Sequence, residues 1–269
     1  MQPKVSIVMP CYCASKTIEA SILSVLSQTM KNWELIIVDD CSQDNSVSIA
    51  QKWTRTDKRI RIVKLKENIG PAEARNIGIK ASEGNFIAFL DSDDIWMPSK
   101  LETQLSAMNF HQAPFSCTSY KVQKNRNISR FINVPKFITS NLMLRGSVIG
   151  CSTVMYDASV FGKIYFTDLT SLYASDLDKC KNIRILHEDY ALWLDILLQQ
   201  LPSGSKISCL GVQECLTIYN ESSSSFSSSK YKAAKSQWII YRKHLKLKLV
   251  SSVFYFLLYT LNGFYRRIL

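Results

Sequence analysis

The first 110 residues repeat one pattern four times: a short strand-like segment is followed by a stretch with helical spacing. Strands are expected at Val5–Met9, Glu34–Val38, Arg59–Leu65 and Asn85–Leu90. Short apolar runs are typical of strands buried on both faces of a parallel sheet. Parallel neighbours need crossover connections, which are right-handed and usually helical. We therefore expect an α/β fold with a mostly parallel central sheet.

The stretches between these strands carry local helix signals. Ile18 and Ile22 begin an apolar pattern at helical spacing. Pro71 stands where proline favours the first turn of a helix. Ser99 and Glu102 have the spacing of a capping box, in which each side chain bonds the other residue's backbone N–H.

The second half of the chain is less regular. Ser129–Phe137 is expected to be extended, and Val148–Tyr156 is an apolar strand region. Thr167–Asn182 is a polar insert, and Tyr190–Leu201 has strong helical periodicity. Ser222–Ser229 holds seven serines in eight residues, which indicates a loop.

Acidic side chains gather where two of the expected strands end. Asp39 and Asp40 close one strand, and Asp91, Asp93 and Asp94 close another. Ligands bind at the carboxyl ends of strands in open parallel sheets. Carboxylates gathered along one edge repel one another unless cations or hydrogen-bond donors neutralise them, and Asp-x-Asp suits Mg²⁺ or Mn²⁺. The alternative is that these residues only cap the following helices.

The positive charge of the chain is concentrated at its C-terminal end. The formal net charge is +11, and nine Lys/Arg but no Asp/Glu lie from Lys230 onward. The first 229 residues hold 24 basic and 22 acidic side chains, so they are nearly neutral. A uniformly basic nucleic-acid binder is therefore a poor fit, and no nucleic-acid partner is expected.

Two long stretches carry a resemblance to a known family: VSIVMPCYCASKTIEASILSVLSQTMKNWELIIVDDCSQD and ENIGPAEARNIGIKASEGNFIAFLDSDDIWMPSKL. They resemble the N-terminal half of glycosyltransferase family 2, whose members are inverting enzymes with the Rossmann-like GT-A fold. The resemblance resumes at His187–Leu194 and Tyr219–Trp238, and Gly150–Asp157 resembles the family's acceptor-side segment. It implies a GT-A three-layer sandwich over 1–229. Residues 1–110 would be its nucleotide-sugar half, 111–229 its acceptor half, and 230–269 a helical tail.

The resemblance implies roles for residues near the donor nucleotide. Pro10 and Tyr12 lie where the family packs the nucleotide base. Asp40 matches the carboxylate that accepts a hydrogen bond from the base, and Asp39 stands beside it. Arg75 occupies the basic position near the diphosphate.

The same comparison implies the catalytic residues. Asp91 and Asp93 match the family's Asp-x-Asp, where Asp93 holds Mn²⁺ or Mg²⁺ and Asp91 lies near the ribose and sugar. Asp189, in the Glu188-Asp189 pair, matches the general base. At the start of a helix it would stay ionised beside the helix dipole, although Glu-Asp in a first turn is also good capping chemistry.

Further contacts with the acceptor or with a lid are expected from Trp96, Glu188, Tyr219 and Lys230. Trp96 is equally suited to packing in the core, and the serine-rich loop to being a lid or a passive linker. Many relatives have arginine where this chain has Asn220, so a phosphate contact is absent or is replaced by a nearby lysine.

The resemblance implies transfer of a sugar from a nucleotide sugar, most simply a UDP-sugar. The acceptor would be a polyprenyl-diphosphate-linked saccharide of a bacterial O-antigen or capsule. Two alternatives remain open. A sugar-1-phosphate nucleotidylyltransferase would need a glycine-rich phosphate loop, which PCYCASKT lacks. A membrane-associated nucleotide-binding subunit without turnover would have no use for both Asp93 and Asp189.

The tail suggests where such an enzyme would act. Its cations lead into an aromatic-rich apolar stretch of 17 uncharged residues, followed by Arg266 and Arg267. This composition resembles an interfacial helix on an anionic membrane surface, although packing on the catalytic domain is the alternative. The N-terminus lacks the features of a secretory signal. We expect a cytoplasmic protein, peripheral on the inner face of the cell membrane.

Overall fold

The computed structural model describes residues 4–124, 127–167, 169, 188–201, 204–221 and 230–268. The chain forms two compact units, each assembled from separate segments. The first unit comprises Met1–Phe137, Ile149–Phe166 and Cys209–Glu221, and the second comprises Ile138–Val148, Thr167–Ser208 and Ser222–Leu269. The domain boundaries expected after residues 110 and 229 remain predictions.

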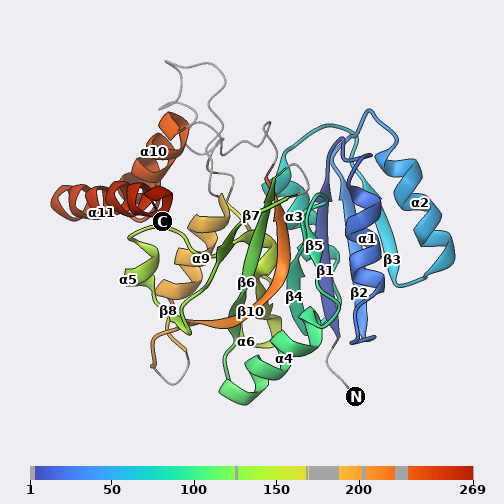
Figure 1. Ribbon diagram of the computed structural model, residues 1–269, viewed down its shortest axis with the longest axis horizontal. Coiled ribbons are helices and arrows are strands. Elements are labelled where there is room, and N and C mark those ends of the chain that lie inside the picture. The colour runs from blue at the N-terminus through green and yellow to red at the C-terminus, as the bar shows by residue number, and fades with distance from the viewer. Residues whose placement is uncertain are drawn as a thin grey trace. The chain divides into compact units, whose positions relative to one another are not determined.

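The first unit begins with the alternating strands and helices that the sequence predicts (Figure 1). Its elements are β1 (Val5–Cys11), α1 (Ile18–Leu26), β2 (Trp33–Asp39), α2 (Ser46–Thr56), β3 (Ile60–Lys64), α3 (Pro71–Ala81), β4 (Phe86–Phe89), β5 (Ile95–Trp96), α4 (Lys100–His111), β6 (Phe115–Lys124), β7 (Asn127–Ile132), η1 (Cys151–Thr153), β9 (Met155–Asp157), α6 (Ala158–Phe161) and β10 (Cys209–Asn220), with β8 (Phe137–Ile138) at its boundary.

The central sheet is mostly parallel, which confirms the expected fold class. Its strands lie in the order β3-β2-β1-β4-β9-β6-β10-β5. The first four run parallel, β9 is antiparallel to both of its neighbours, and β6 and β10 run parallel to each other. The four N-terminal βα units therefore form one continuous parallel half.

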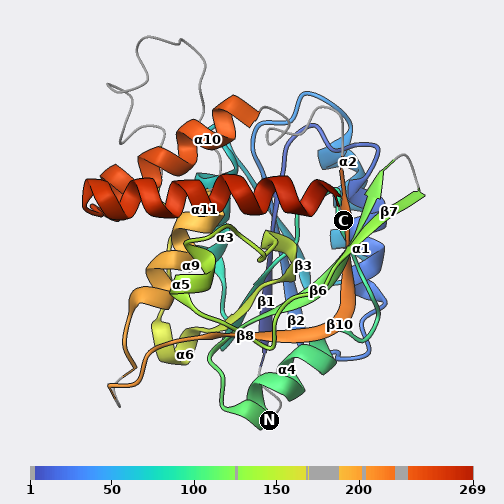
Figure 2. The ribbon, with the colours of Figure 1, turned by 60° about the vertical axis from the view of Figure 1, so that its left-hand side comes forward.

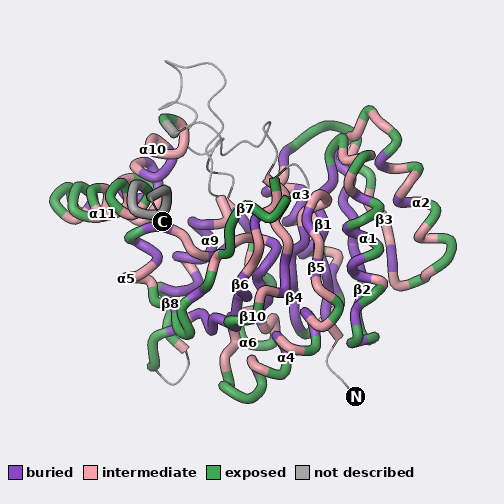
Figure 3. Tube along the Cα trace, viewed as in Figure 1, coloured by how far each residue is buried: buried purple, intermediate pink, exposed green. Residues whose placement is uncertain are grey.

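The two faces of that parallel half are covered by different helices, because side chains alternate between the faces along each strand. Ile7 and Leu35 belong to a core that also contains residues of α1, α2 and α4. Ile36 and Val38 point to the opposite face, where Ala74 of α3 packs. The central strands are buried throughout (Figure 3). These contacts build three layers: helices, sheet and helix.

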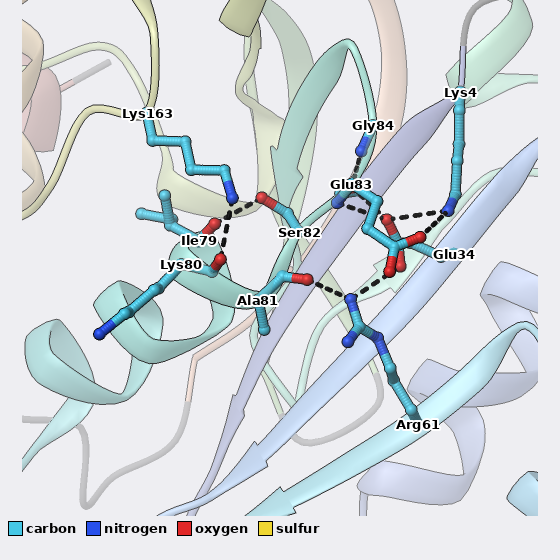
Figure 4. A network of polar contacts seen from close by, with 11 residues as sticks. Lys4, Glu34, Arg61, Ile79, Lys80, Ala81, Ser82, Glu83, Gly84 and Lys163 are labelled. Carbon is cyan, nitrogen blue, oxygen red and sulfur yellow. Dashed lines mark hydrogen bonds and ion pairs between the residues drawn. The ribbon is translucent and has the colours of Figure 1, made fainter.

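The amino ends of these strands are tied together by one polar network (Figure 4). Glu34 of β2 accepts hydrogen bonds from Ser6 Oγ at 2.7 Å and from Glu83 N at 2.8 Å. Its other carboxylate oxygen lies 2.9 Å from a guanidinium nitrogen of Arg61, and Lys4 Nζ lies 3.3 Å from the first. Arg61 also donates to the carbonyl of Ala81, at the end of α3. The network therefore joins β1, β2, β3 and α3 at the edge opposite the aspartates.

Two local predictions were wrong. Most of Val148–Tyr156 is not strand, because the 3₁₀ turn η1 occupies its middle and only the short β9 follows. Ser99 is the N-cap residue of α4, but its side chain makes no capping hydrogen bond. Glu102 instead accepts from Thr29 Oγ1 at 2.5 Å, so a long-range contact replaces the expected capping box.

The second unit is helical in its described part. Its elements are α5 (Ser140–Met143), α9 (Glu188–Leu198), α10 (Lys230–Ile239), the π-helix η3 (Ile240–His244) and α11 (Leu249–Ile268). The helical tail expected after Lys230 is confirmed as α10, η3 and α11. Helices α10 and α11 lie close together (Figure 2). The polar insert lies almost entirely outside the described residues, as does the serine-rich loop.

Among the helices that the structure describes, none combines the length and apolar character needed to cross a membrane.

Candidate active site

The carboxyl ends of β1, β2 and β4 bring the predicted donor residues to one edge of the sheet. Cys11 pairs with Asp39 in the β1–β2 register, so Tyr12 and Asp40 follow at equivalent positions. Pro10 is buried within β1, whereas the Tyr12 side chain is 54% exposed. An exposed aromatic ring beside buried strand ends is free to stack on a flat ligand group.

The loop after β1 is held by side chains that follow β2. Ser42 Oγ accepts from Cys13 N at 2.9 Å, Ser46 Oγ accepts from Ala14 N at 2.7 Å, and Asp44 accepts from Ser15 N at 3.0 Å. Burial alone would raise the pKa of Asp44, but its hydrogen bonds from Ser46 and Ser15 outweigh burial and lower it. The polar cluster that marks the start of α2 thus also shapes this loop.

Asp40 uses both carboxylate oxygens to hold the loop before α3. Oδ1 accepts from Ile69 N at 2.8 Å, and Oδ2 accepts from Gly70 N at 2.9 Å. Gly70 has φ of 95°, a left-handed conformation that glycine adopts without strain. Each carboxylate oxygen can accept a second hydrogen bond. The assignment of Asp40 to the nucleotide base therefore remains a prediction, now for a residue with a structural role as well.

Asp39 has a different environment. Its Oδ2 accepts from Ser42 N at 3.3 Å, while Oδ1 is buried without a hydrogen-bond partner among the described residues. A buried acceptor left unpaired costs about 1–3 kcal/mol. Asp39 Oδ1 could therefore accept a hydrogen bond from a ligand at the edge where the nucleotide is expected.

Arg75 and Asp91 form an ion pair between α3 and the end of β4. Arg75 Nη2 lies 2.5 Å from Asp91 Oδ1, and the arginine is only 9% exposed. Its guanidinium carbon also lies 5.4 Å from the centre of the Phe166 ring. Helix α3 therefore delivers a buried cation to the acidic edge of the sheet, where a diphosphate could exchange with Asp91 as its partner.

Asp93 lies two residues further along, in the turn formed by Asp91–Asp94. Burial raises the pKa of Asp93, and the charge of Asp91 raises it further, to about 6. The backbone N–H of Asp93 and the charge of Arg75 act in the opposite direction. Among the described residues, Asp93 thus has less compensating positive charge than Asp91, which pairs with Arg75.

Asp94 is fully buried and holds this turn in place. Its Oδ2 accepts from Ser152 Oγ at 2.5 Å, and its Oδ1 accepts from Asn220 N at 2.9 Å. Ser152 Oγ also accepts from Asp91 N at 3.1 Å, and the Asn220 side chain donates to the carbonyl of Asp93. Burial, and then the charges of Asp93 and Asp91, raise the pKa of Asp94 well above its ordinary value.

Sequence reasoning missed the role of Ser152 and gave Asn220 a different meaning. A single serine in GCSTVMYD carries no signal of its own. Asn220 stands out only as a departure from the arginine of many relatives, yet in the structure it anchors the acidic turn through its backbone and its side chain. Trp96 has the packing role that the sequence left open, because it is 1% exposed and its indole N–H donates to Ser152 O at 2.7 Å.

The donor set at the turn fits a divalent cation that also binds substrate. No group of three or more His, Cys, Asp or Glu residues within the described ranges could hold a metal by itself. Mg²⁺ commonly takes one or two carboxylates and completes its shell with water and substrate phosphate oxygens. Asp91 and Asp93 supply that number of carboxylates, and a bound cation would favour the ionised form of Asp93, whose pKa burial and the charge of Asp91 raise.

Tyr219 is the penultimate residue of β10 and lies near the carboxyl groups of Asp91, Asp93 and Asp94. Burial raises its pKa, and the charges of Asp94, Asp91 and Asp93 raise it further. Its ring centroid lies 6.4 Å from that of Tyr120. Its expected contact with the acceptor or a lid remains a prediction. Of Lys230 only the backbone is described, as the first residue of α10.

Asp189 belongs to the second unit, in the first turn of α9. Its Oδ1 accepts from Tyr190 N at 2.8 Å, and Glu188 precedes it at the start of the helix. Tyr190 is buried and its hydroxyl donates to Met143 O at 2.9 Å, which anchors this end of α9. The base assignment of Asp189 therefore rests on its sequence motif and its helix position. His187 lies outside the described residues.

Comparisons with known proteins identify the family. The family description "Glycosyl transferase family 2" matches residues 6–159, more than half of the chain. The putative teichuronic acid biosynthesis glycosyltransferase TuaG of Bacillus subtilis is 37% identical over 269 residues, covering 99% of this chain and 98% of that protein. The UDP-Glc:alpha-D-GlcNAc-diphosphoundecaprenol beta-1,3-glucosyltransferase WfgD of Escherichia coli is 37% identical, covering 96% of this chain and 93% of that protein.

Solved structures share the fold. The crystal structure of residues 1–349 of TarS from S. aureus superposes with a TM-score of 0.66 at 20% identity, over 96% of this chain and 70% of that one. The mannosyltransferase PcManGT from Pyrobaculum calidifontis, in complex with GDP-Man and Mn²⁺, superposes with a TM-score of 0.62 at 15% identity. The match covers 92% of this chain and 66% of that one. The family match, the long relatives and the shared fold agree: this chain belongs to glycosyltransferase family 2 and is a glycosyltransferase.

Proposed function

We propose that the chain transfers a sugar, with inversion, from a UDP-sugar to a hydroxyl of a polyprenyl-diphosphate-linked saccharide. The product would enter a bacterial surface polysaccharide of the O-antigen or capsule type. The observation that carries the proposal is the pairing of buried Arg75 with Asp91 beside the cation-deficient Asp93. The acceptor class is supported by WfgD and WfaP of Escherichia coli, both named for α-D-GlcNAc-diphosphoundecaprenol and matched over 93% of their own length.

The donor nucleotide would lie along the carboxyl edge of the parallel strands. The exposed ring of Tyr12 would stack on the base, and Asp39 and Asp40 would accept from its N–H groups. Arg75 would exchange its contact with Asp91 for one with the diphosphate. A guanidinium already buried and positioned needs little reorganisation to stabilise charge that develops on the departing group.

Asp91 and Asp93 would hold Mn²⁺ or Mg²⁺ together with the diphosphate oxygens. When bound, this cation would neutralise the charge of the leaving nucleoside diphosphate. Asp94, Ser152 and Asn220 would keep the two carboxylates in place, since all three bond the turn that carries them.

Asp189 would remove the proton of the acceptor hydroxyl as its oxygen attacks the anomeric carbon. Inversion needs one such base and no covalent enzyme intermediate. The Glu-Asp motif and the place of Asp189 in the first turn of α9 support this role.

The loop after β1 does not favour the alternative function of a sugar-1-phosphate nucleotidylyltransferase. Phosphate loops use free backbone N–H groups to cradle phosphate. Three consecutive amides after β1, those of Cys13, Ala14 and Ser15, already donate to side chains of the α2 loop.

The test uses the purified full chain with a panel of nucleotide sugars, a synthetic GlcNAc-diphosphate lipid and either Mg²⁺ or Mn²⁺, read by mass spectrometry. We expect a product one sugar heavier with a UDP-sugar. Asp93→Ala should abolish transfer and metal-dependent donor hydrolysis. Asp57→Asn is the matched control, because Asp57 pairs with Arg59 before β3, at the amino end of the strands.

Each negative outcome has a distinct meaning. Transfer to another acceptor class alone would overturn the acceptor assignment. Donor binding without transfer or hydrolysis with any sugar would favour the non-catalytic nucleotide-binding alternative. Full activity of Asp93→Ala would remove that residue from the cation site.

A further inference from the structure

Helix α11 has one face packed against the protein and one exposed apolar face. One face packs within the second unit: Phe256 lies 5.5 Å from Trp238 between ring centroids, Tyr255 donates to Asn141 at 3.0 Å, and Asn262 donates to Arg145 O at 2.8 Å. Ser252 on the same face is fully buried. This side of α11 is therefore already occupied by the protein.

The opposite face is exposed and apolar. We call it the outer stripe, and it consists of Val250, Val253, Phe254, Leu257 and Leu261. These side chains are between 43% and 82% exposed, and Val250 is the most exposed. Their spacing confines them to an arc of about 100° on a regular helix. A continuous apolar stripe of this kind marks an interaction surface.

Charge indicates which partner fits the stripe. Lys243, Lys246 and Lys248 are exposed just before α11, and Arg266 and Arg267 follow its apolar stretch in the sequence. No Asp or Glu occurs anywhere from Lys230 to Leu269. Lys248 directly precedes α11, where a cation opposes the helix dipole, so helix stability does not explain it; Lys243 lies in the last turn of η3, where a cation is favourable. Apolar side chains flanked by cations are the composition of a helix that lies in the interface of an anionic membrane.

We propose that the outer stripe inserts into the headgroup boundary of an anionic lipid leaflet, with the flanking cations on the lipid phosphates. The inner face of α11 stays packed, so docking requires no unfolding of the second unit. Phe256 packs against Trp238 and therefore takes no part in this contact. It rests on the proposed function only for the location of the acceptor, since lipid binding itself needs no catalysis.

The test is flotation of the purified full chain with extruded vesicles of phosphatidylcholine and phosphatidylglycerol at 7:3, against pure phosphatidylcholine. We expect binding to the anionic vesicles and a sharp decrease at 1 M salt, where charges are screened within about 3 Å. Phe254→Asp or Leu257→Asp should weaken partitioning by roughly tenfold or more. Lys243→Gln with Lys248→Gln should weaken it by roughly thirtyfold.

Phe110→Asp is the matched control, because Phe110 of α4 is 84% exposed but belongs to the first unit. It should bind vesicles like the unaltered chain. All variants should retain the far-UV circular dichroism of the unaltered chain and its donor hydrolysis in solution. A chain that binds vesicles but transfers no sugar would leave docking intact and contradict only the proposed function.

Three results would overturn the proposal. The first is an unaltered chain that does not float with anionic vesicles. The second is equal binding by the outer-stripe variants. The third is self-association in solution that Phe254→Asp abolishes without any effect of lipid, which would assign the stripe to a second copy of the chain.

Discussion

Asp91, Asp93 and Asp94 are neighbours in the chain but have three different environments. Asp91 is paired with Arg75, Asp93 has a pKa raised to about 6, and Asp94 is fully buried with two hydrogen-bond donors. We expect the first two to give oxygens to a ligand. Asp94 instead accepts hydrogen bonds that hold the turn in place, so we expect it to be a positioning residue.

These different environments predict that substitutions of Asp93 and of Asp94 have different effects on stability and metal dependence. Asp94→Ala removes the acceptors of Ser152 Oγ and Asn220 N, so we expect a stability loss of about 1–3 kcal/mol. The turn should also loosen, raising the metal concentration needed for half-maximal donor hydrolysis while saturating metal restores much of the rate. Asp93→Ala should stay inactive at any metal concentration. Identical metal titrations of the two variants would contradict this division, and thermal unfolding checks the stability term.

If Asp189 is the general base, its substitution should lower turnover without changing donor affinity. Asp189→Asn keeps the size and one acceptor oxygen of the side chain but cannot take a proton from the acceptor. We expect turnover to fall by about 10²–10⁴-fold with donor affinity nearly unchanged. Isothermal titration with UDP and steady-state rates measure the two quantities. Near-normal turnover would exclude Asp189 as the base, and a large loss of UDP affinity would point to a donor-side role.

At the scale of elements, the position of α3 depends on a glycine. A Cβ on Gly78 would lie 2.4 Å from Val8 Cγ1 and 3.3 Å from Val38 Cγ2, both buried in the sheet. Alanine gains about 1 kcal/mol of helix propensity, but overpacking costs about 1–3 kcal/mol. We expect Gly78→Ala to destabilise the chain by about 1 kcal/mol. It should also lower transfer, because Arg75 lies one turn earlier on the same helix.

Gly263→Ala in α11 is the matched substitution, since a Cβ there meets no atom within 4 Å. It should leave stability unchanged or raise it by up to about 1 kcal/mol. Denaturant unfolding of the two variants measures the difference. Equal effects would mean that the close approach of α3 to β1 does not decide the stability of this element.

Sequence reasoning was most reliable where a segment's structure is decided locally. The four βα units were predicted within a few residues, because buried strands are apolar and the stretches between them show helical spacing or a proline in the first turn. Val148–Tyr156 was predicted wrongly because apolar residues also line a buried 3₁₀ turn. The capping box at Ser99 was lost to a contact of Glu102 with Thr29, a residue 73 positions away.

The same distinction between local patterns and long-range contacts applies to the candidate site. The aspartates at the strand ends were predicted because parallel topology gathers those ends at one edge. Their partners were not, since Asn220 bonds Asp94 from 126 residues away and no local pattern marks such a pair. Likewise, Phe256 and Phe254 are equally apolar in sequence, and only packing decides which of them faces the protein.

At the scale of the whole molecule, the two ends of the parallel strands serve different purposes. The carboxyl ends hold the residues of the proposed site, and Asp39 Oδ1 there has no hydrogen-bond partner among the described residues. The amino ends hold the network of Glu34, whose carboxylate pairs with Lys4 and Arg61 (Figure 4). Repulsion and an unpaired acceptor at one edge destabilise the fold, and the network at the other edge offsets part of that cost.

This division predicts how stability depends on pH. Burial alone would raise the pKa of Glu34, but hydrogen bonds from Ser6 and Glu83 N and the charge of Lys4 lower it below its ordinary value. A carboxyl group whose pKa is lower in the folded chain stabilises the fold fully above its unfolded pKa, about 4.3. That contribution is lost as the pH falls through the folded pKa. Glu34→Gln should therefore cost about 1–2 kcal/mol at pH 7 and progressively less in more acidic solution.

Denaturant unfolding at a series of pH values from neutral to acidic measures this convergence of the two stability curves. Glu83→Gln is the control, because its side chain is 68% exposed and contacts only Lys4 among the described residues, while its backbone N–H still donates to Glu34. It should change stability little at any pH, since exposed ion pairs contribute about 0–1 kcal/mol. A Glu34→Gln effect that stays constant across the series would show that shape and hydrogen bonding, rather than the charge of Glu34, hold the amino ends of the strands together.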